Sequence, residues 1–396
     1  MNPVSWICIL AVLTSLSTGC RTAQPAAGLS ASPDLVLTSP GHRIVYQRGV
    51  DGNGLIPVGG RSPWPGAELE ARLAPVKASP TGSRWQSLGR ADAAGHFSQT
   101  IRASAGWYRL EVRLKDTPAA RTIIERVGVG EVFIVVGHSV AQGGETNLAG
   151  EADDRVNTIA WPAVAAERRR DYERTADPSL LPALLGTPFT NDVVPAPFGH
   201  GTYFWAAFAG QIARREDVPV LLLNAAFGGT SLEHWARSAR GEMFEHSFVR
   251  AAIRMPYINL HHALRQYAAH TGVRAILADQ GQNDWPEPDG DTVFANYRAF
   301  VNQARADFGF TNLAVVVNRQ TPPGGQVQIR AAQERMLRDV PAAFPGPDYD
   351  TLAPADRYDG IHLSASGLSR AAQLWADALT PEFFRQVPPC LPREQP

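Results

Sequence analysis

Cysteine is scarce in this chain of 396 residues, which contains only Cys8, Cys20 and Cys390. We expect Cys8 to be lost with an export signal, and a lipidated Cys20 would leave Cys390 alone. The sequence therefore implies no disulfide framework, and stability must come from hydrophobic cores. The histidines and cysteines show no spacing typical of a zinc site, and the sequence predicts no metal and no other cofactor.

Excess charge of one sign is also absent, because the formal net charge is −1 and only 19% of the residues are charged. No overall field favours nucleic acid or an anionic membrane, so we expect no nucleic-acid partner. The densest basic stretch, ERRRDYER at 167–174, mixes both signs. That mixture predicts a solvated helix face rather than a phosphate-binding segment.

A hydrophobic run long enough to span a membrane is missing from the N-terminus. The apolar run Ile7–Leu16 is shorter than the roughly 20 residues of a spanning helix, and small residues follow it. This pattern predicts an export signal over 1–20. Its end, STGC, resembles a bacterial lipobox, in which Cys20 would carry lipid and begin the mature chain. Ser17 stands where such motifs favour Leu and no basic residue precedes the run, so plain secretion stays open as the alternative.

The next two segments differ in composition and in hydrophobic period. Residues 21–40 are rich in Ala, Pro and Ser, which predicts a tether. Residues 41–127 contain short runs that alternate apolar and polar side chains, such as GWYRLEVRL at 106–114. A period of two indicates antiparallel strands with one solvated face, so we predict a small β-sandwich domain.

The pattern changes again over 128–388. Continuous apolar runs lie at 132–136, 218–223, 273–277 and 312–317, and helical stretches separate them. Strands that are buried on both faces and alternate with helices predict an α/β fold with a parallel sheet and helices on both faces. The long connection over 145–199 shows no clear strand, and we expect it to cover the active-site end of the sheet.

Polar residues and glycines follow the predicted strands and precede the last helix. Ligands of parallel sheets bind beyond the carboxyl ends of the strands, where all these residues are expected to meet. In chain order they are Ser139, Gly228 with Gly229, Asn283, and Asp359 with His362.

Ester hydrolysis needs a nucleophile, a base and donors for the oxyanion, and these residues can supply each. Ser139 is the candidate nucleophile, and His362 is its base, oriented by Asp359 three residues earlier. The backbone N–H of Ser139, that of Gly228 or Gly229, and the Asn283 amide are the candidate oxyanion donors.

The ordered blocks GVGEVFIVVGHSVAQGG, LLLNAAFGGTSLEHW, DQGQND and YDGIHLSASG resemble the SGNH hydrolase superfamily and, within it, the sialate O-acetylesterase-like carbohydrate esterases. The resemblance implies a three-layer, flavodoxin-like sheet and a metal-free serine esterase that deacetylates sugars or polysaccharides. By this resemblance, Ser139, Asp359 and His362 would be the catalytic residues, and Gly228 or Gly229 and Asn283 would belong to the oxyanion hole. His138, Val140 and Gln282 depart from the usual family blocks beside the site, and leave acyl and sugar preference open.

Four residues next to these blocks are candidates for substrate binding: His138, Gln282, Trp235 and Trp285. Either tryptophan would stack on a sugar ring if it bordered the cleft; packing in the core is the alternative. Asp284 is expected to be a structural hydrogen-bonding group.

The sequence predicts an exported esterase that forms an acyl-enzyme on an acetylated sugar, and two alternatives compete with this prediction. VGHSVA is one residue short of the nucleophile motif of α/β-hydrolases, but no strand–helix–strand pattern precedes Ser139. The second alternative is a non-catalytic carbohydrate-binding surface protein on a degenerate hydrolase scaffold. Such a protein would not need a base next to a serine, and the presence of Ser139, Asn283, Asp359 and His362 together counts against it.

Overall fold

The computed structural model describes residues 34–77, 83–144, 147–284 and 289–392. The predicted signal over 1–20, with Cys20, and most of the tether over 21–40 lie outside these ranges, so their assignment stays a prediction. None of the helices in the described ranges combines the length and the apolar character needed to cross a membrane.

The N-terminal domain consists of two β-sheets. The first sheet is antiparallel and contains β1 (Val36–Ser39), β3 (Asn53–Arg61) and β6 (His96–Ser104). The second contains β2 (Val45–Gln47), β4 (Glu68–Pro75), β5 (Gln86–Arg90), β7 (Gly106–Leu114) and the first part of β8 (Arg121–Gly137). Buried residues of both sheets, including Ile56, Ile101, Leu110 and Val112, share one core. The predicted β-sandwich is confirmed.

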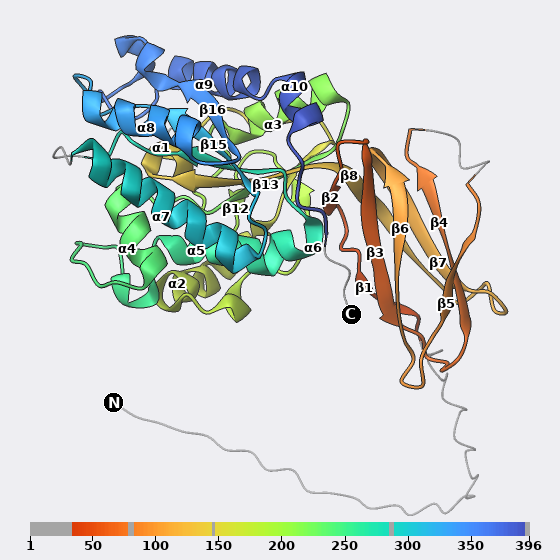
Figure 1. The fold of residues 1–396 in the computed structure, drawn as a ribbon. Coiled ribbons are helices and arrows are strands. Elements are labelled where there is room, and N and C mark those ends of the chain that lie inside the picture. The colour runs from red at the N-terminus through yellow and green to blue at the C-terminus, as the bar shows by residue number, and fades with distance from the viewer. Residues whose placement is uncertain (1–33, 78–82, 145–146, 285–288, 393–396) are drawn as a thin grey trace, which may run out of the picture. The chain divides into compact units, whose positions relative to one another are not determined.

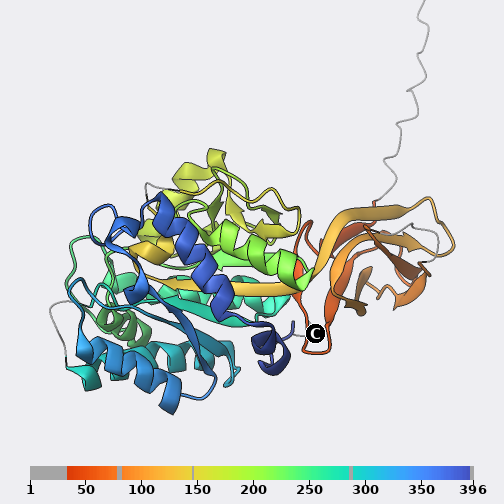
Figure 2. The ribbon, with the colours of Figure 1, turned by 90° about the horizontal axis from the view of Figure 1, so that it is seen from above.

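Strand β8 joins this domain to the next one without a linker. Its residues up to Val129 pair with β7, and its second half, Glu131–Gly137, pairs with β13 (Val220–Asn224) and β14 (Ala275–Asp279). Figure 2 shows β8 as one extended ribbon that enters both sheets. The predicted boundary between 127 and 128 thus falls inside a strand.

The second domain contains the predicted parallel sheet. Its strand order is β9 (Val156–Thr158), β13, β8, β14, β15 (Ala314–Arg319) and β16 (Ala343–Asp348), and every neighbouring pair is parallel. Short β11 (Thr187–Pro188) adds an antiparallel edge next to β9. The predicted runs at 218–223, 273–277 and 312–317 match β13, β14 and β15 within about two residues, and the run at 132–136 lies in the second half of β8. The edge strands β9 and β16 were not predicted.

Helices cover both faces of this sheet, as predicted, because successive strand residues point to opposite sides. Phe133 and Val135 of β8 face one core, which α3 (Trp205–Glu216), α9 (Ala365–Ala378) and α10 (Pro381–Gln386) complete. Val132 and Ile134 face the other core. The helices on that side are α4 (Leu232–Arg240), α5 (Tyr257–His262), α6 (Ala269–Thr271), α7 (Gly290–Phe308) and α8 (Val327–Asp339). Figure 1 shows α3 and α9 on one side of the strands and α5 and α7 on the other.

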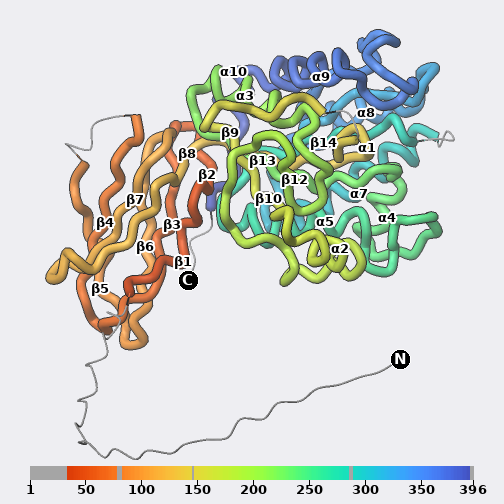
Figure 3. The backbone as a smooth tube through the Cα atoms, turned by 180° about the vertical axis from the view of Figure 1, so that it is seen from behind, coloured from red at the N-terminus to blue at the C-terminus, as the bar shows by residue number. Residues whose placement is uncertain are grey.

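The long connection after β8 has more regular structure than the sequence indicates. Its described part contains β9 and β11 and the two-stranded pair of β10 (Ala160–Trp161) with β12 (Val194–Pro195). It also contains α2 (Ala166–Thr175), which carries the mixed-charge stretch. Figure 3 shows α2, β10 and β12 grouped on one side of the molecule.

A buried ion cluster fixes β8 where the two domains meet. Glu131 is fully buried and pairs with Arg274, which is also fully buried, at 2.8 Å and with Arg48 at 2.6 Å. The Gln47 amide also donates a hydrogen bond to this carboxylate, at 3.0 Å. Burial alone would raise the pKa of Glu131, but the two guanidinium groups outweigh it and lower the pKa.

We predict that Glu131→Ala lowers the free energy of unfolding by about 3–5 kcal/mol, because it leaves the buried Arg274 charge without its partner. Urea denaturation measures this change. Glu125→Ala is the matched control, because Glu125 lies on the same strand and its pair with Arg109 is exposed. Glu125→Ala should lower the free energy of unfolding by less than about 1 kcal/mol. Equal effects of the two substitutions would contradict the role of the cluster.

Candidate active site

Three loops that follow neighbouring strands meet at one edge of the parallel sheet. Val135 of β8 pairs with Asn224 at the end of β13, and Gly137 pairs with Asp279 at the end of β14. The loop after each strand therefore starts at nearly the same height. Ser139 follows β8, Gly228 follows β13 and Asn283 follows β14, and all three line one cavity.

The turn that presents Ser139 depends on a close approach of two backbones. Gly137 has a φ of +141°, and a Cβ added there would lie 1.9 Å from the Asp279 carbonyl oxygen. Only glycine fits this position without displacing β14. Ser139 then begins the short helix α1 (Ser139–Gln142), whose preceding residue, His138, accepts the Val140 N–H through Nδ1.

Ser139, His362 and Asp359 are connected by hydrogen bonds. His362 Nε2 lies 2.9 Å from Ser139 Oγ, although 223 positions separate the two residues in the chain. His362 Nδ1 lies 2.7 Å from Asp359 Oδ2 on the opposite side of the ring. The structure thus brings the predicted nucleophile, base and acid together in the expected order.

The loop before α9 holds this aspartate in place. Asp359 Oδ1 accepts the backbone N–H groups of Ile361 at 2.9 Å and of His362 at 2.6 Å. Partial burial would raise the pKa of Asp359, but the hydrogen bonds from the His362 ring and from these N–H groups lower it to about 2. The carboxylate therefore stays ionised over the whole neutral range and can stabilise a charged imidazole.

Gly228 is the glycine of the predicted pair that lies against the serine. A Cβ at Gly228 would contact Ser139 Cβ at 3.4 Å and Gln142 Oε1 at 2.9 Å. Its N–H, however, donates to Gln142 Oε1 at 2.7 Å. In this structure the Gly228 donor is thus already occupied by a residue that the sequence analysis did not single out.

The other candidate oxyanion donors differ in their surroundings. Gly229 has a φ of +73°, and a Cβ there would collide with Phe248, so it serves the turn. Asn283 is exposed in the cavity. Within the described residues, neither the Ser139 N–H nor the Asn283 side chain has a hydrogen-bond partner.

The cavity in front of Ser139 has a volume of about 810 Å³. Residues of the long connection form part of its wall, which confirms that the connection covers the active-site end of the sheet. The lining residues that the sequence analysis missed are Gln142, Phe198, His200, Phe227, Phe248, Arg250 and Ile361, with Arg170, Asp171, Glu173 and Arg174 of α2.

The predicted solvated helix face over 167–174 is confirmed, because Tyr172 is the only buried residue of α2, and part of the exposed face lines the cavity. Glu173 pairs with Arg169 at 2.9 Å and Asp171 with Arg174 at 3.0 Å, so the mixed signs compensate each other along the helix. Periodicity shows which residues share a face, but the partner of that face comes from the path of the connection. No local signal would have placed α2 beside Ser139.

Two predicted substrate contacts are wrong, because their side chains are buried. Trp235 is only 1% exposed; its ring packs on Phe300, and its N–H donates to Thr230 Oγ1 at 3.0 Å. His138 is also 1% exposed and lies 3.1 Å from the Gln320 amide. Burial lowers the pKa of His138 to about 3, so its ring is neutral at neutral pH.

The other two predicted substrate contacts have different outcomes. Gln282 is 5% exposed, and its amide faces the Ile361 carbonyl at 3.4 Å, so it supports the histidine loop rather than the cavity. Trp285 lies outside the described residues. Its predicted contact with a sugar stays a prediction.

Two buried carboxyl groups lie behind the site. Asp284 accepts the Leu232 N–H at 2.7 Å, in agreement with its predicted structural role. Asp279 accepts hydrogen bonds from the Asn318 and Gln320 amides. Burial raises the pKa of each group to about 7. Among the residues that the structure covers, no cluster of three or more His, Cys, Asp or Glu side chains is arranged to bind a metal.

The parallel sheet with helices on both faces, and the serine, glycine, asparagine and histidine at its edge, define an SGNH-type hydrolase fold. A carbohydrate acetylesterase from Xanthomonas citri is 18% identical, with a TM-score of 0.54 over 87% of this chain and 74% of that protein. A protein from Arabidopsis thaliana is 14% identical, with a TM-score of 0.43 over 65% of this chain and 98% of the other.

The sequence model of the family described as "carbohydrate esterase, sialic acid-specific acetylesterase" matches residues 129–380, which is more than half of the chain. The chain belongs to this family and is a carbohydrate esterase. No curated protein sequence gave a significant match. The resemblance stated from the sequence is thereby confirmed.

We predict that Gly137→Ala destabilises the protein by about 2–6 kcal/mol, because a methyl group would combine backbone strain with overlap on β14. Gly144→Ala is the control, since a Cβ there meets no atom within 4 Å. Thermal and urea denaturation of both variants measure the difference. A Gly137→Ala protein as stable as the control would refute the close approach of β8 and β14.

Proposed function

We propose that this chain is an exported serine esterase that releases acetate from acetylated carbohydrates through an acyl-enzyme. The contact of His362 Nε2 with Ser139 Oγ at 2.9 Å, with Asp359 behind the ring, is the observation that supports the mechanism. The family supports ester hydrolysis on a carbohydrate.

In the proposed first step, Ser139 Oγ attacks the carbonyl carbon of the ester while its proton moves to His362 Nε2. The negative charge that develops on the carbonyl oxygen is stabilised by the Ser139 N–H and the Asn283 amide. The bond to the sugar oxygen then breaks, and His362 returns the proton to that oxygen. Asp359 stabilises the imidazolium between these two transfers.

In the proposed second step, water attacks the acetyl group on Ser139, and His362 Nε2 accepts a proton from the water. The bond to Ser139 Oγ breaks, the serine regains its proton from His362, and acetate leaves. Because His362 is half-buried at the edge of an open cavity, water can reach the acyl group on the side away from the sheet.

We predict that Ser139→Ala lowers kcat for p-nitrophenyl acetate by about 10⁴- to 10⁶-fold, since the variant lacks the attacking oxygen. Release of p-nitrophenol measures the rate, and urea denaturation checks the fold. Ser369→Ala, an exposed serine on α9, is the control and should keep wild-type turnover.

A fluorophosphonate probe separates this proposal from a non-catalytic sugar-binding protein. Covalent labelling of Ser139 in the wild type, absent in Ser139→Ala, is expected of the esterase. An unlabelled wild-type protein, or full turnover by Ser139→Ala, would reject the proposal.

We further propose that Cys20 carries the lipid after export. Expressed in a bacterial host, the full-length chain should incorporate labelled palmitate and fractionate with membranes, whereas Cys20→Ser should stay unlabelled. Cys390→Ser is the matched control and should keep the label. Export without label in the wild type would indicate plain secretion, and recovery of the wild type in the cytoplasm would contradict export.

A further inference from the structure

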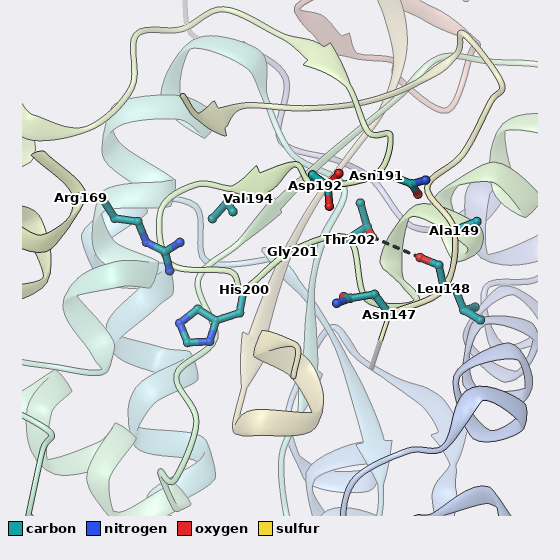
Figure 4. A pocket seen from close by; sticks show the side chains of 10 residues that line it. All are labelled: Asn147, Leu148, Ala149, Arg169, Asn191, Asp192, Val194, His200, Gly201 and Thr202. Carbon is teal, nitrogen blue, oxygen red and sulfur yellow. Dashed lines mark hydrogen bonds between the residues drawn. The ribbon is translucent and has the colours of Figure 1, made fainter. Parts of the chain in front are cut away.

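A second cavity, whose lining Figure 4 shows, has a volume of about 770 Å³ and shares His200 with the catalytic cavity. Four separate segments form its wall, and most of their side chains are polar. The lining residues are Asn147, Leu148, Ala149, Arg169, Asn191, Asp192, Val194, His200, Gly201 and Thr202.

Single side chains separate the two cavities. His200 lines both of them, and its Nε2 lies 3.2 Å from the Gln142 amide of the catalytic cavity. Arg169 of the second cavity pairs with Glu173 of the catalytic cavity at 2.9 Å. The two cavities are therefore neighbours that share the His200 side chain as a common wall.

Part of the second wall is held by internal hydrogen bonds. Asn147 Oδ1 accepts the Tyr203 N–H at 2.9 Å. Thr202 Oγ1 donates to the Leu148 carbonyl at 3.4 Å, the contact that Figure 4 marks with a dashed line. Arg169 Nη2 donates to the Gly199 carbonyl at 3.2 Å. These contacts fix the shape of the cavity before any ligand binds.

Two charged groups in this wall remain available to a ligand. Asp192 is exposed, and no described residue forms a hydrogen bond or ion pair with its carboxylate. The Arg169 guanidinium uses Nε and Nη2 for the contacts above, which leaves the donors on Nη1.

The lining favours a neutral ligand with many hydroxyl groups. Arg169 and Asp192 have opposite charges, so neither a polyanion nor a cation meets a matching field. An acyl chain would leave their polar groups desolvated without partners. Hydroxyl groups both donate and accept, so they satisfy the carboxylate, the guanidinium and the amides of this wall.

We propose that the second cavity binds the sugar unit next to the one whose ester is cleaved, so that the substrate is an acetylated oligosaccharide or polysaccharide. This inference rests on the proposed function, because it places the ester at Ser139. A linked second unit binds without a second loss of translational freedom, so its contacts add directly to the affinity. Hydrogen bonds to charged groups should then raise kcat/KM by about tenfold.

The test compares substrates that differ only in length. We would measure acetate release from partially acetylated xylo-oligosaccharides and cello-oligosaccharides of one to four units. In the wild type, kcat/KM per ester should rise about tenfold between one and three units in at least one series. No rise in either series would overturn the proposal.

Two variants locate the length dependence in the second cavity. Arg169→Met removes the donors, and Asp192→Gly removes the carboxylate at a position where φ is +61°, which suits glycine. In both variants the ratio of kcat/KM for three units to that for one unit should fall to near one. Arg335→Met loses a similar ion pair on α8, with Asp339, and should keep the wild-type ratio. A wild-type ratio in both cavity variants would overturn the proposal.

Binding to Ser139→Ala, measured by calorimetry with the same series, tests the cavity without turnover. We expect three units to bind about tenfold more tightly than one, and Arg169→Met in this background to abolish the difference. Length-independent binding, or none, would overturn the second cavity as a sugar site. A failure of the proposed esterase function gives a different result from a failure of the second sugar site. In the former case the fluorophosphonate probe does not label Ser139, and p-nitrophenyl acetate is not hydrolysed.

Discussion

The site depends on the register in which β8 pairs with β13 and β14. A parallel strand that slipped by one residue would send every side chain to the opposite face and displace Ser139 from the neighbouring loops. Three features oppose such a slip. Residues of β8 face two different cores, Glu131 is held in a buried ion cluster, and Gly137 fits against the Asp279 carbonyl. The same strand also belongs to the β-sandwich, so the N-terminal domain helps to fix the position of Ser139 after the end of β8.

The sequence was sufficient for those parts of the fold that burial dictates. The apolar runs of β13, β14, β15 and the second half of β8 are buried on both faces, and continuous apolar sequence is typical of such strands. The edge strands β9 and β16 escaped detection because they are short or contain proline and glycine. The boundary between the domains was misplaced because no linker exists there to alter the composition.

For the candidate site, the sequence predicted where along the sheet the residues lie, but not which way every side chain points. Residues that directly follow a buried strand must lie at the edge of the sheet, which placed Ser139, Gly228 and Asn283 correctly. Neighbours such as His138 and Trp235 share that location along the chain, but their side chains turn into the interior. Sequence position gives the place of a residue but not the direction of its side chain. The contribution of α2 depends on tertiary packing alone.

Gln142 illustrates why geometry changes the chemical argument. The Gly228 N–H donates to Gln142 Oε1 at 2.7 Å, and both residues line the catalytic cavity. An oxyanion that took the same N–H would have to break this bond first, so the net gain from Gly228 in the transition state is small. The Ser139 N–H and the Asn283 amide give up no such contact within the described residues. Because only interactions that strengthen in the transition state accelerate a reaction, these two donors should carry most of the oxyanion stabilisation in the proposed mechanism.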